Sequence, residues 1–169
     1  MRVAQNMIAA AVTAPKGCGI DNIAACIIDG KEKDVMARHM RDIARETGAD
    51  FFERDAGNLD NSHCVVVIGV KNNPILLEDC SLCGFKDCAQ TIAAGANCAF
   101  NITDMGIAIG SAVSVAADNR IDNRVLFSAG KAALRMNLLG DDVNICFGIP
   151  LSTSSKSIFF DRDPGAVLV

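Results

Sequence analysis

The sequence contains neither tyrosine nor tryptophan, and its 169 residues include only two histidines and four prolines. Half of the residues are hydrophobic, so the core must be built from Ile, Val, Leu, Ala and Met together with eight phenylalanines. A chain of this length buries about 70% of its unfolded surface. We therefore expect a single domain, residues 1–169, that needs no disulfide bonds to be stable.

Clusters of basic residues and long apolar segments are also missing. The net charge is −4 and the pI is near 5.1, which removes the electrostatic attraction on which nucleic-acid binding depends. No apolar run reaches the roughly 18 residues of a membrane span, and the first residues lack the apolar segment of a secretory signal. We expect a protein of the reducing cytoplasm, with no nucleic-acid or membrane partner, whose cysteines are thiols or metal ligands.

Several catalytic motifs are absent as well. There is no phosphate-binding loop, no nucleophile elbow and no dinucleotide-binding glycine fingerprint. His39 and His63 each lack a partner at ligand spacing, so we interpret both as solvated or capping residues. Hydrolase and kinase chemistry thus have no support.

What the sequence does contain is a dense group of cysteines. Four of the eight, Cys80, Cys83, Cys88 and Cys98, follow the spacing C-x2-C-x4-C-x9-C. Thiolates are soft ligands that select zinc or iron–sulfur clusters. Residues 79–100 are therefore the candidate metal-binding segment.

Three interpretations of these four cysteines remain open. A 4Fe-4S cluster takes four thiolates, and a C-x2-C pair with a third cysteine nearby can surround one part of it. Structural zinc accepts four sulfurs tetrahedrally. The third interpretation is four free thiols. Three of the other four cysteines lie in apolar runs and are predicted to be buried: Cys26, Cys64 and Cys146. Cys18 is the exception.

Hydrophobic periodicity predicts helices and strands that alternate along the chain. The expected helices are 3–13, 31–47, 105–117 (fully buried and capped by Asp104) and 125–139. The expected strands are 23–28, 64–70 as a central strand, 143–148 ending before Pro150, and 158–160. The repeated pattern at 51–55 and 159–163 is interpreted as two similar strand or turn ends. These elements indicate an α/β-like or α+β fold with one central sheet.

The cysteine segment resembles the small iron–sulfur domain with the pattern C-x2-C-G-x3-C and a distal cysteine, found in corrinoid-linked and electron-transport proteins. Gly84 follows the second cysteine as in that pattern, and the distance to Cys98 is shorter. Nearly the whole chain resembles a family of uncharacterised prokaryotic proteins containing a ferredoxin domain. The segments that carry this resemblance are 13–17, 51–55, the cysteine segment, 106–123 and 148–150.

The order of elements is similar to that of the nitroreductases, dimeric α+β flavoproteins. Residues 9–19 resemble their helix and Ala-Pro-Ser loop, 104–117 their dimer helix, and 147–150 their penultimate Gly-Tyr-Pro. Lys16 replaces the Ser, and the Arg-rich start is missing. The resemblance implies a central sheet flanked by helices with a Cys-rich loop insert, FMN bound at a subunit interface, and a homodimer through the helix that carries Gly106 and Gly110. Lys16, the Gly17 amide and Lys156 are the candidate phosphate donors.

Two functions follow from the sequence. The first is a redox protein in which a 4Fe-4S cluster exchanges single electrons with a flavin or a redox partner protein, with or without an enzymatic activity of the nitroreductase type. The second is a non-enzymatic iron–sulfur or zinc module for sensing or interaction, in which the metal orders the loop.

Overall fold

The computed structural model describes residues 1–160. Eleven elements follow one another in these residues. They are α1 (Arg2–Thr13), η1 (Gly17–Gly19), β1 (Ile23–Asp29), α2 (Gly30–Thr47), α3 (Phe51–Asp60), β2 (Cys64–Lys71), α4 (Cys88–Ala93), α5 (Ala99–Asp118), β3 (Asp122–Asn123), α6 (Phe127–Arg135) and β4 (Val143–Ser152). The predicted α+β class with one sheet is confirmed.

The sheet has four strands in the order β1-β2-β4-β3, and every neighbouring pair is antiparallel. The unbroken β-branched run of β2 predicts a strand buried on both faces. Residues 65–68 are indeed fully buried, and β2 pairs with β1 on one side and β4 on the other. The prediction of a central strand at 64–70 is confirmed.

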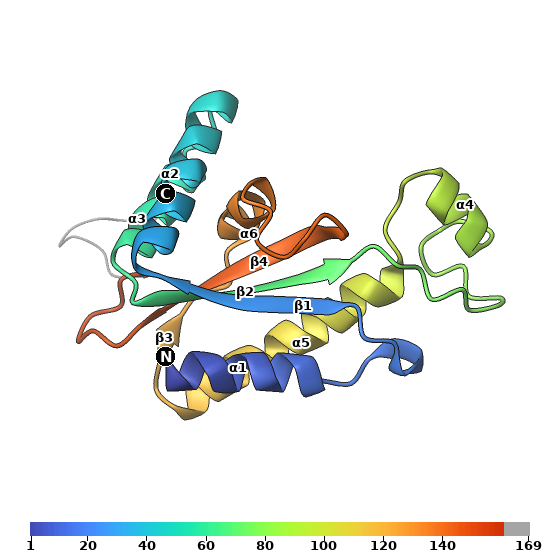
Figure 1. Cartoon of the computed structure of the whole chain (residues 1–169), viewed down its shortest axis with the longest axis horizontal. Helices are drawn as coiled ribbons and strands as arrows, with labels where there is room; N and C mark the ends of the chain where they lie inside the picture. The colour runs from blue at the N-terminus through green and yellow to red at the C-terminus, as the bar shows by residue number, and fades with distance from the viewer. Residues whose placement is uncertain (161–169) are drawn as a thin grey trace.

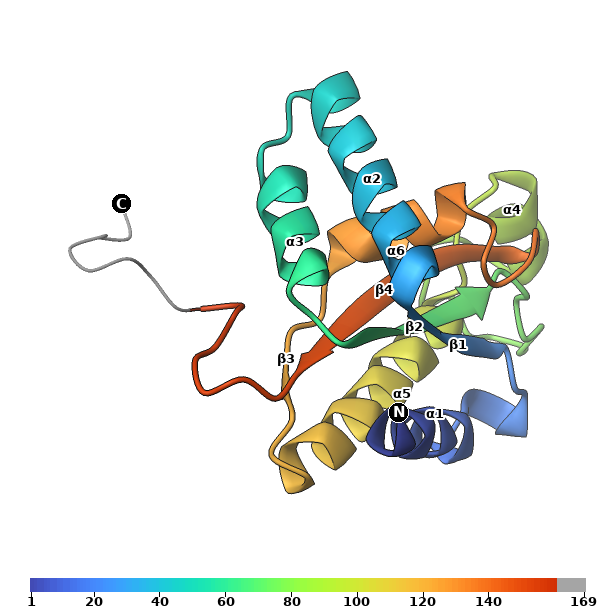
Figure 2. The ribbon, with the colours of Figure 1, turned by 60° about the vertical axis from the view of Figure 1, so that its left-hand side comes forward.

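Helices cover both faces of the sheet (Figures 1 and 2). On one face, α1 and α5 pack on side chains of β2 and β4, among them Val66 and Ile149. On the other face, α2, α3 and α6 pack on the alternate side chains, among them Val65 and Val67. The period-2 alternation of β2 therefore supplies two separate cores, one for each helical layer.

The long helix α5 differs from its prediction in two ways. It begins at Ala99 with Cys98 as its N-cap residue, so Asp104 lies inside the helix instead of capping it. It is also not fully buried within this chain: Gly106 and Gly110 are exposed, and a Cβ on either would meet nothing within 4 Å. Among residues 1–160, α5 is the one helix long and apolar enough to pass a membrane-span test by length and composition, with 33% of the tested window buried.

Three other predictions from the sequence are wrong. Residues 51–60 form helix α3 instead of a strand or turn end, with Phe52, Ala56 and Leu59 packed in the core. The strand β4 continues through Pro150, which pairs with Val65; no β3 residue pairs with Pro150, so its missing N–H is tolerated. Residues 158–160 form a turn, and the remainder of the pattern at 159–163 lies outside the described residues.

The cysteine segment leaves the sheet at the end of β2. Figure 1 shows α4 and the loops around it projecting beyond the sheet, next to the first turn of α5. Of the four cysteines, Cys80 and Cys83 lie in the loop between β2 and α4, Cys88 is the first residue of α4, and Cys98 precedes α5. The sheet and α5 thus hold the two ends of a loop insert.

Candidate metal centre

All four cysteines of the predicted site line a single cavity of about 250 Å³. Cys80, Cys83 and Cys88 are half-buried, and Cys98 is buried at 6% exposure. Apolar side chains, including Leu82 and Phe100, complete the wall of the cavity. The fold therefore brings together the four residues that spacing alone had grouped.

The four cysteines do not form a ready-made site for a single metal ion. Within residues 1–160, no group of three or more His, Cys, Asp or Glu side chains is arranged to hold a metal ion. A tetrahedral zinc site needs four sulfurs each about 2.3 Å from one centre. What the four cysteines share in the folded chain is therefore the cavity that they line.

Local helix geometry positions two of the cysteines. The Asp87 carboxylate accepts a hydrogen bond of 2.9 Å from the Gln90 backbone N–H and so caps α4, which fixes Cys88 at its first position. Cys98 is itself the N-cap residue of α5 and makes no side-chain capping hydrogen bond. The starts of α4 and α5 thus set the positions of two of the four cysteines.

The cysteines differ in how readily they ionise. The Thr91 hydroxyl, 3.0 Å from Cys83 Sγ, and then the Phe85 backbone N–H lower the pKa of Cys83. Burial raises the pKa of Cys26 to about 11 and that of Cys146 to about 12. Metals bind the thiolate, so Cys83 is suited to ligation while the two core cysteines remain neutral thiols.

A network of asparagines holds both ends of the cysteine loop. Asn101, at 1% exposure in the first turn of α5, donates to the backbone O of Lys71 at 3.1 Å. It also accepts from the amide of Asn22 at 3.3 Å, and Asn22 accepts from the amide of Asn73 at 3.1 Å. The loop therefore departs from β2 and returns to α5 at one buried polar cluster.

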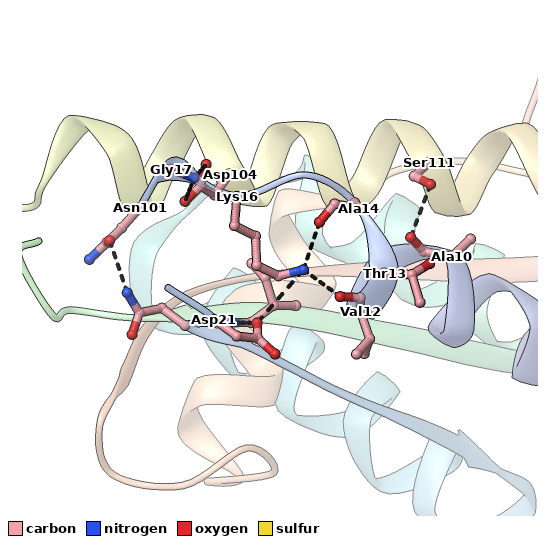
Figure 3. Close-up of polar contacts among 12 residues, drawn as sticks. Ala10, Val12, Thr13, Ala14, Lys16, Gly17, Asp21, Asn101, Asp104 and Ser111 are labelled. Atoms are coloured by element: carbon pink, nitrogen blue, oxygen red, sulfur yellow. Dashed lines mark hydrogen bonds and ion pairs between the residues drawn. The ribbon is translucent and has the colours of Figure 1, made fainter. Parts of the chain in front are cut away.

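The two candidate donors of the glycine loop are both engaged within the chain (Figure 3). Lys16 Nζ donates to the carbonyl oxygens of Val12 and Ala14 and lies 3.8 Å from the Asp21 carboxylate. The Gly17 N–H donates to both carboxylate oxygens of Asp104, at 3.0 and 3.1 Å. A phosphate at this position would have to compete with a carboxylate, and the cofactor role of Lys16 and Gly17 stays a prediction.

Lys156 lies in the polar segment after β4, far along the chain from the glycine loop. Its backbone O accepts a hydrogen bond of 2.6 Å from Ser154 Oγ. The cofactor role of Lys156 also stays a prediction. His63 bonds to Thr153 at 3.1 Å, as expected of a solvated surface residue.

Sequence reasoning missed three residues that build the site: Thr91, Asn101 and Asp104, each at most 5% exposed. For Asp104 and Asn101 a signal existed, since a carboxylate and an amide within an apolar helix need buried partners. For Thr91 none existed, because its partner Cys83 is close only in the folded chain.

Comparison with known proteins agrees with this architecture. A family model described as "Uncharacterized protein containing a ferredoxin domain" matches residues 94–162, which include Cys98 and none of the other three cysteines of the cavity. A protein of Archaeoglobus fulgidus, named "Uncharacterized protein", is 37% identical over 166 residues, covering 94% of this chain and 89% of its own. The chain belongs to this family of uncharacterized proteins containing a ferredoxin domain.

Solved structures show the fold. A nitroreductase with bound FMN from Desulfitobacterium hafniense matches with a TM-score of 0.61 and 15% identity, over 99% of this chain and 86% of its own. A nitroreductase with bound FMN from Bacteroides fragilis matches with a TM-score of 0.62 and 12% identity, over 99% and 80%. A BluB-like flavoprotein from Clostridium difficile matches with a TM-score of 0.53 and 16% identity, over 92% and 84%. The predicted nitroreductase-like fold is confirmed, and family and fold together support a redox role.

Proposed function

We propose that this protein is an electron carrier that binds a 4Fe-4S cluster through Cys80, Cys83, Cys88 and Cys98. The observation that carries the proposal is that these four residues, from one loop and two helix starts, line one cavity of about 250 Å³. A bound cluster would supply reversible one-electron chemistry: it is reduced as a donor protein is oxidised, and then passes the electron to an acceptor. A reducing cytoplasm, which keeps these thiols available for iron, is part of the proposal.

The number of the cysteines and the cavity that they line support a cluster in this proposal. A 4Fe-4S cube carries one thiolate on each of four separate irons, so its ligands are spread around its corners. The four cysteines of this chain line one cavity of about 250 Å³, which is where the cluster would bind. The Thr91 hydroxyl and the lowered pKa of Cys83 add a stabilised thiolate at one of the positions.

The fold supports FMN as a second redox group. Two of the similar structures are nitroreductases with bound FMN. In this chain Lys16 and the Gly17 amide, once displaced from their internal partners, would serve the phosphate, and Lys156 is a separate candidate in the segment after β4. A flavin there would exchange one-electron for two-electron steps, which is the basis for a reductase activity.

We also propose that the protein is a homodimer through α5. The outward face of α5 carries exposed Gly106 and Gly110, with exposed Ile102 and Ile107 beside them. A second copy would cover this apolar face, since glycines allow close approach of two backbones. Gly110→Leu is expected to shift the protein toward monomer on size-exclusion chromatography. Gly57→Leu in α3, where a Cβ also meets nothing within 4 Å, is the matched control.

The cluster is tested by iron and acid-labile sulfide analysis of anaerobically purified protein. We expect iron and sulfide in equal amounts and a broad absorption band near 400 nm, whereas flavin bands would report FMN. Cys83→Ser is expected to lose the bound iron and leave the far-ultraviolet circular dichroism of the scaffold unchanged.

Cys18→Ser is the control for the loss of a thiol. Cys18 is exposed in η1 and does not line the cavity, so this variant should retain its iron. Stoichiometric zinc in a colourless protein would replace the cluster by the zinc module. The absence of any metal from anaerobic protein would refute the ligand assignment.

A further inference from the structure

Thr91 is a buried hydroxyl beside one of the four cysteines. It lies in α4, one turn after Cys88, at 1% exposure. Its Oγ1 lies 3.0 Å from Cys83 Sγ and 3.2 Å from the backbone O of Asp87. A short helix thus holds a polar side chain against a sulfur of the cavity.

The single hydroxyl hydrogen of Thr91 has two acceptors to choose between. When Cys83 is a thiol, its S–H donates to Oγ1, and the hydroxyl donates to the Asp87 carbonyl. When Cys83 is a thiolate, its sulfur only accepts, so the hydroxyl turns toward it. Metals are bound by thiolates, and the Thr91 hydroxyl is therefore a donor to Cys83 in the metal-bound protein.

This contact distinguishes Cys83 from its three companions. In the part of the chain that the structure describes, no side chain hydrogen-bonds to the sulfur of Cys80, Cys88 or Cys98. Exposed leucines, Leu76 and Leu82, surround the same cavity and offer no donor. Cys83 is consequently in a more polar environment than the other three cysteines of the cavity.

We propose that Thr91 is a positioning residue that orients Cys83 and raises the reduction potential of the bound cluster. This inference rests on the proposed function. Reduction adds one electron, and part of the added negative charge resides on the cysteine sulfurs. A hydrogen bond donated to a sulfur is stronger in that state, so it favours the reduced form.

The test is a potentiometric titration of the cluster, followed by electron paramagnetic resonance. Thr91→Val removes the hydroxyl and is expected to lower the ratio of reduced to oxidised cluster at a fixed potential about tenfold, which equals about 59 mV for one electron. Thr91→Ser keeps the hydroxyl and is expected to retain the wild-type potential. A potential in Thr91→Val equal to that of the wild type overturns the inference.

Thr13→Val is the matched control. Thr13 Oγ1 donates to the Ala9 carbonyl at 2.8 Å, the same bond to the residue four positions earlier that Thr91 makes with Asp87. Thr13 lies in α1 and does not line the cavity, so this variant should leave the potential unchanged.

Thr91→Ala is made alongside, since alanine favours helix and avoids a branched side chain in α4. If neither variant without the hydroxyl binds iron while Thr91→Ser does, Thr91 has a purely structural role and the tuning role is overturned. If the wild-type protein itself binds no iron, the proposed function has failed instead. These outcomes therefore distinguish a failure of the tuning role of Thr91 from a failure of the proposed cluster.

Discussion

The sheet core and the cysteine loop are stabilised by opposite means. In β2 the apolar residues 65–68 are at 0% exposure between two helical layers, whereas Leu76 and Leu82 of the loop are at 70% and 65%. Non-glycine residues with left-handed backbone angles also gather in the loop, at Leu76 (φ 56°), Asp79 (φ 53°) and Ser81 (φ 48°). Such angles are unfavourable for these residue types. The core is held by its own packing, while the loop depends on its anchors and on whatever it binds.

The largest expected effect comes from disrupting the core where α6 crosses β4. A Cβ on Gly130 would lie 1.7 Å from the Cys146 carbonyl oxygen, a backbone atom that cannot move aside. Gly130→Ala is expected to lower the free energy of unfolding by more than about 4 kcal/mol, measured by urea denaturation. The proposed iron binding should be lost together with the fold, because the loop is anchored to β2 and α5, which pack in the same domain.

Gly57→Ala is the control for this substitution. Gly57 lies in helix α3 with nothing within 4 Å of its Cβ position, so alanine should stabilise the protein by up to about 1 kcal/mol through helix propensity. Equal stability of the two alanine variants would show that α6 does not lie against β4 as closely as described.

The second-largest expected effect concerns the attachment of the cysteine loop to the sheet core. Asn101→Ala removes the donor to the Lys71 carbonyl and the acceptor of the Asn22 amide, and it leaves buried polar groups unpaired. We expect a loss of about 2 kcal/mol in the free energy of unfolding and faster proteolysis within residues 74–97. Urea denaturation and limited proteolysis with mass spectrometry measure the two quantities.

Asn97→Ala is the control for Asn101→Ala. It distinguishes the loss of the buried Asn101 amide from the loss of any asparagine amide near the end of the loop. Asn97 also lies near the end of the loop and pairs with Asn144 at 2.6 Å, but that hydrogen bond is exposed. Its loss should change stability by less than about 0.5 kcal/mol. If both variants are cut at the same rate, the buried network is not the anchor of the loop.

The same comparison explains how much could be predicted from the sequence. Periodicity located β2 and the amphipathic α2 correctly, because burial on a sheet or helix face imposes a repeat of 2 or 3.6 residues. The prediction missed α3, since the adjacent Phe51 and Phe52 suggested a strand or turn end, although Phe52 is one of the core residues of a helix. It also placed the start of α5 at Asp104, whose carboxylate in fact binds the Gly17 N–H.

For the candidate site, spacing along the chain was sufficient to group the four cysteines, since a short loop cannot carry them far apart. The partners of those cysteines could not be found in this way. Thr91 contacts Cys83, which lies 8 positions earlier in the chain, and Asn101 contacts Asn22, which lies 79 positions earlier. Only the folded chain brings these pairs together.

The smallest expected effects concern two exposed ion pairs, one in each region. The Arg135 guanidinium, with N–O distances of 2.9 and 2.6 Å, lowers the pKa of Glu46 below its ordinary value of 4.5 and links α6 to α2. Lys71, at 2.8 Å, lowers the pKa of Asp142 below its ordinary value of 3.8 at the base of the cysteine loop. Both carboxylates have lower pKa values in the folded state.

Each pair therefore stabilises the fold above the unfolded pKa of its carboxyl group, and the contribution is lost as the pH falls through the folded pKa. Glu46→Gln and Asp142→Asn should lower the melting temperature slightly near pH 7, and the difference from the wild type should shrink as the pH falls through the folded pKa, in thermal denaturation at low ionic strength. Salt should reduce both differences, because the pairs are exposed. Since Asp142 lies beside the loop anchor, Asp142→Asn should in addition speed cleavage within residues 74–97, and Glu46→Gln should not. Equal cleavage in the two variants would mean that the loop and the core open together.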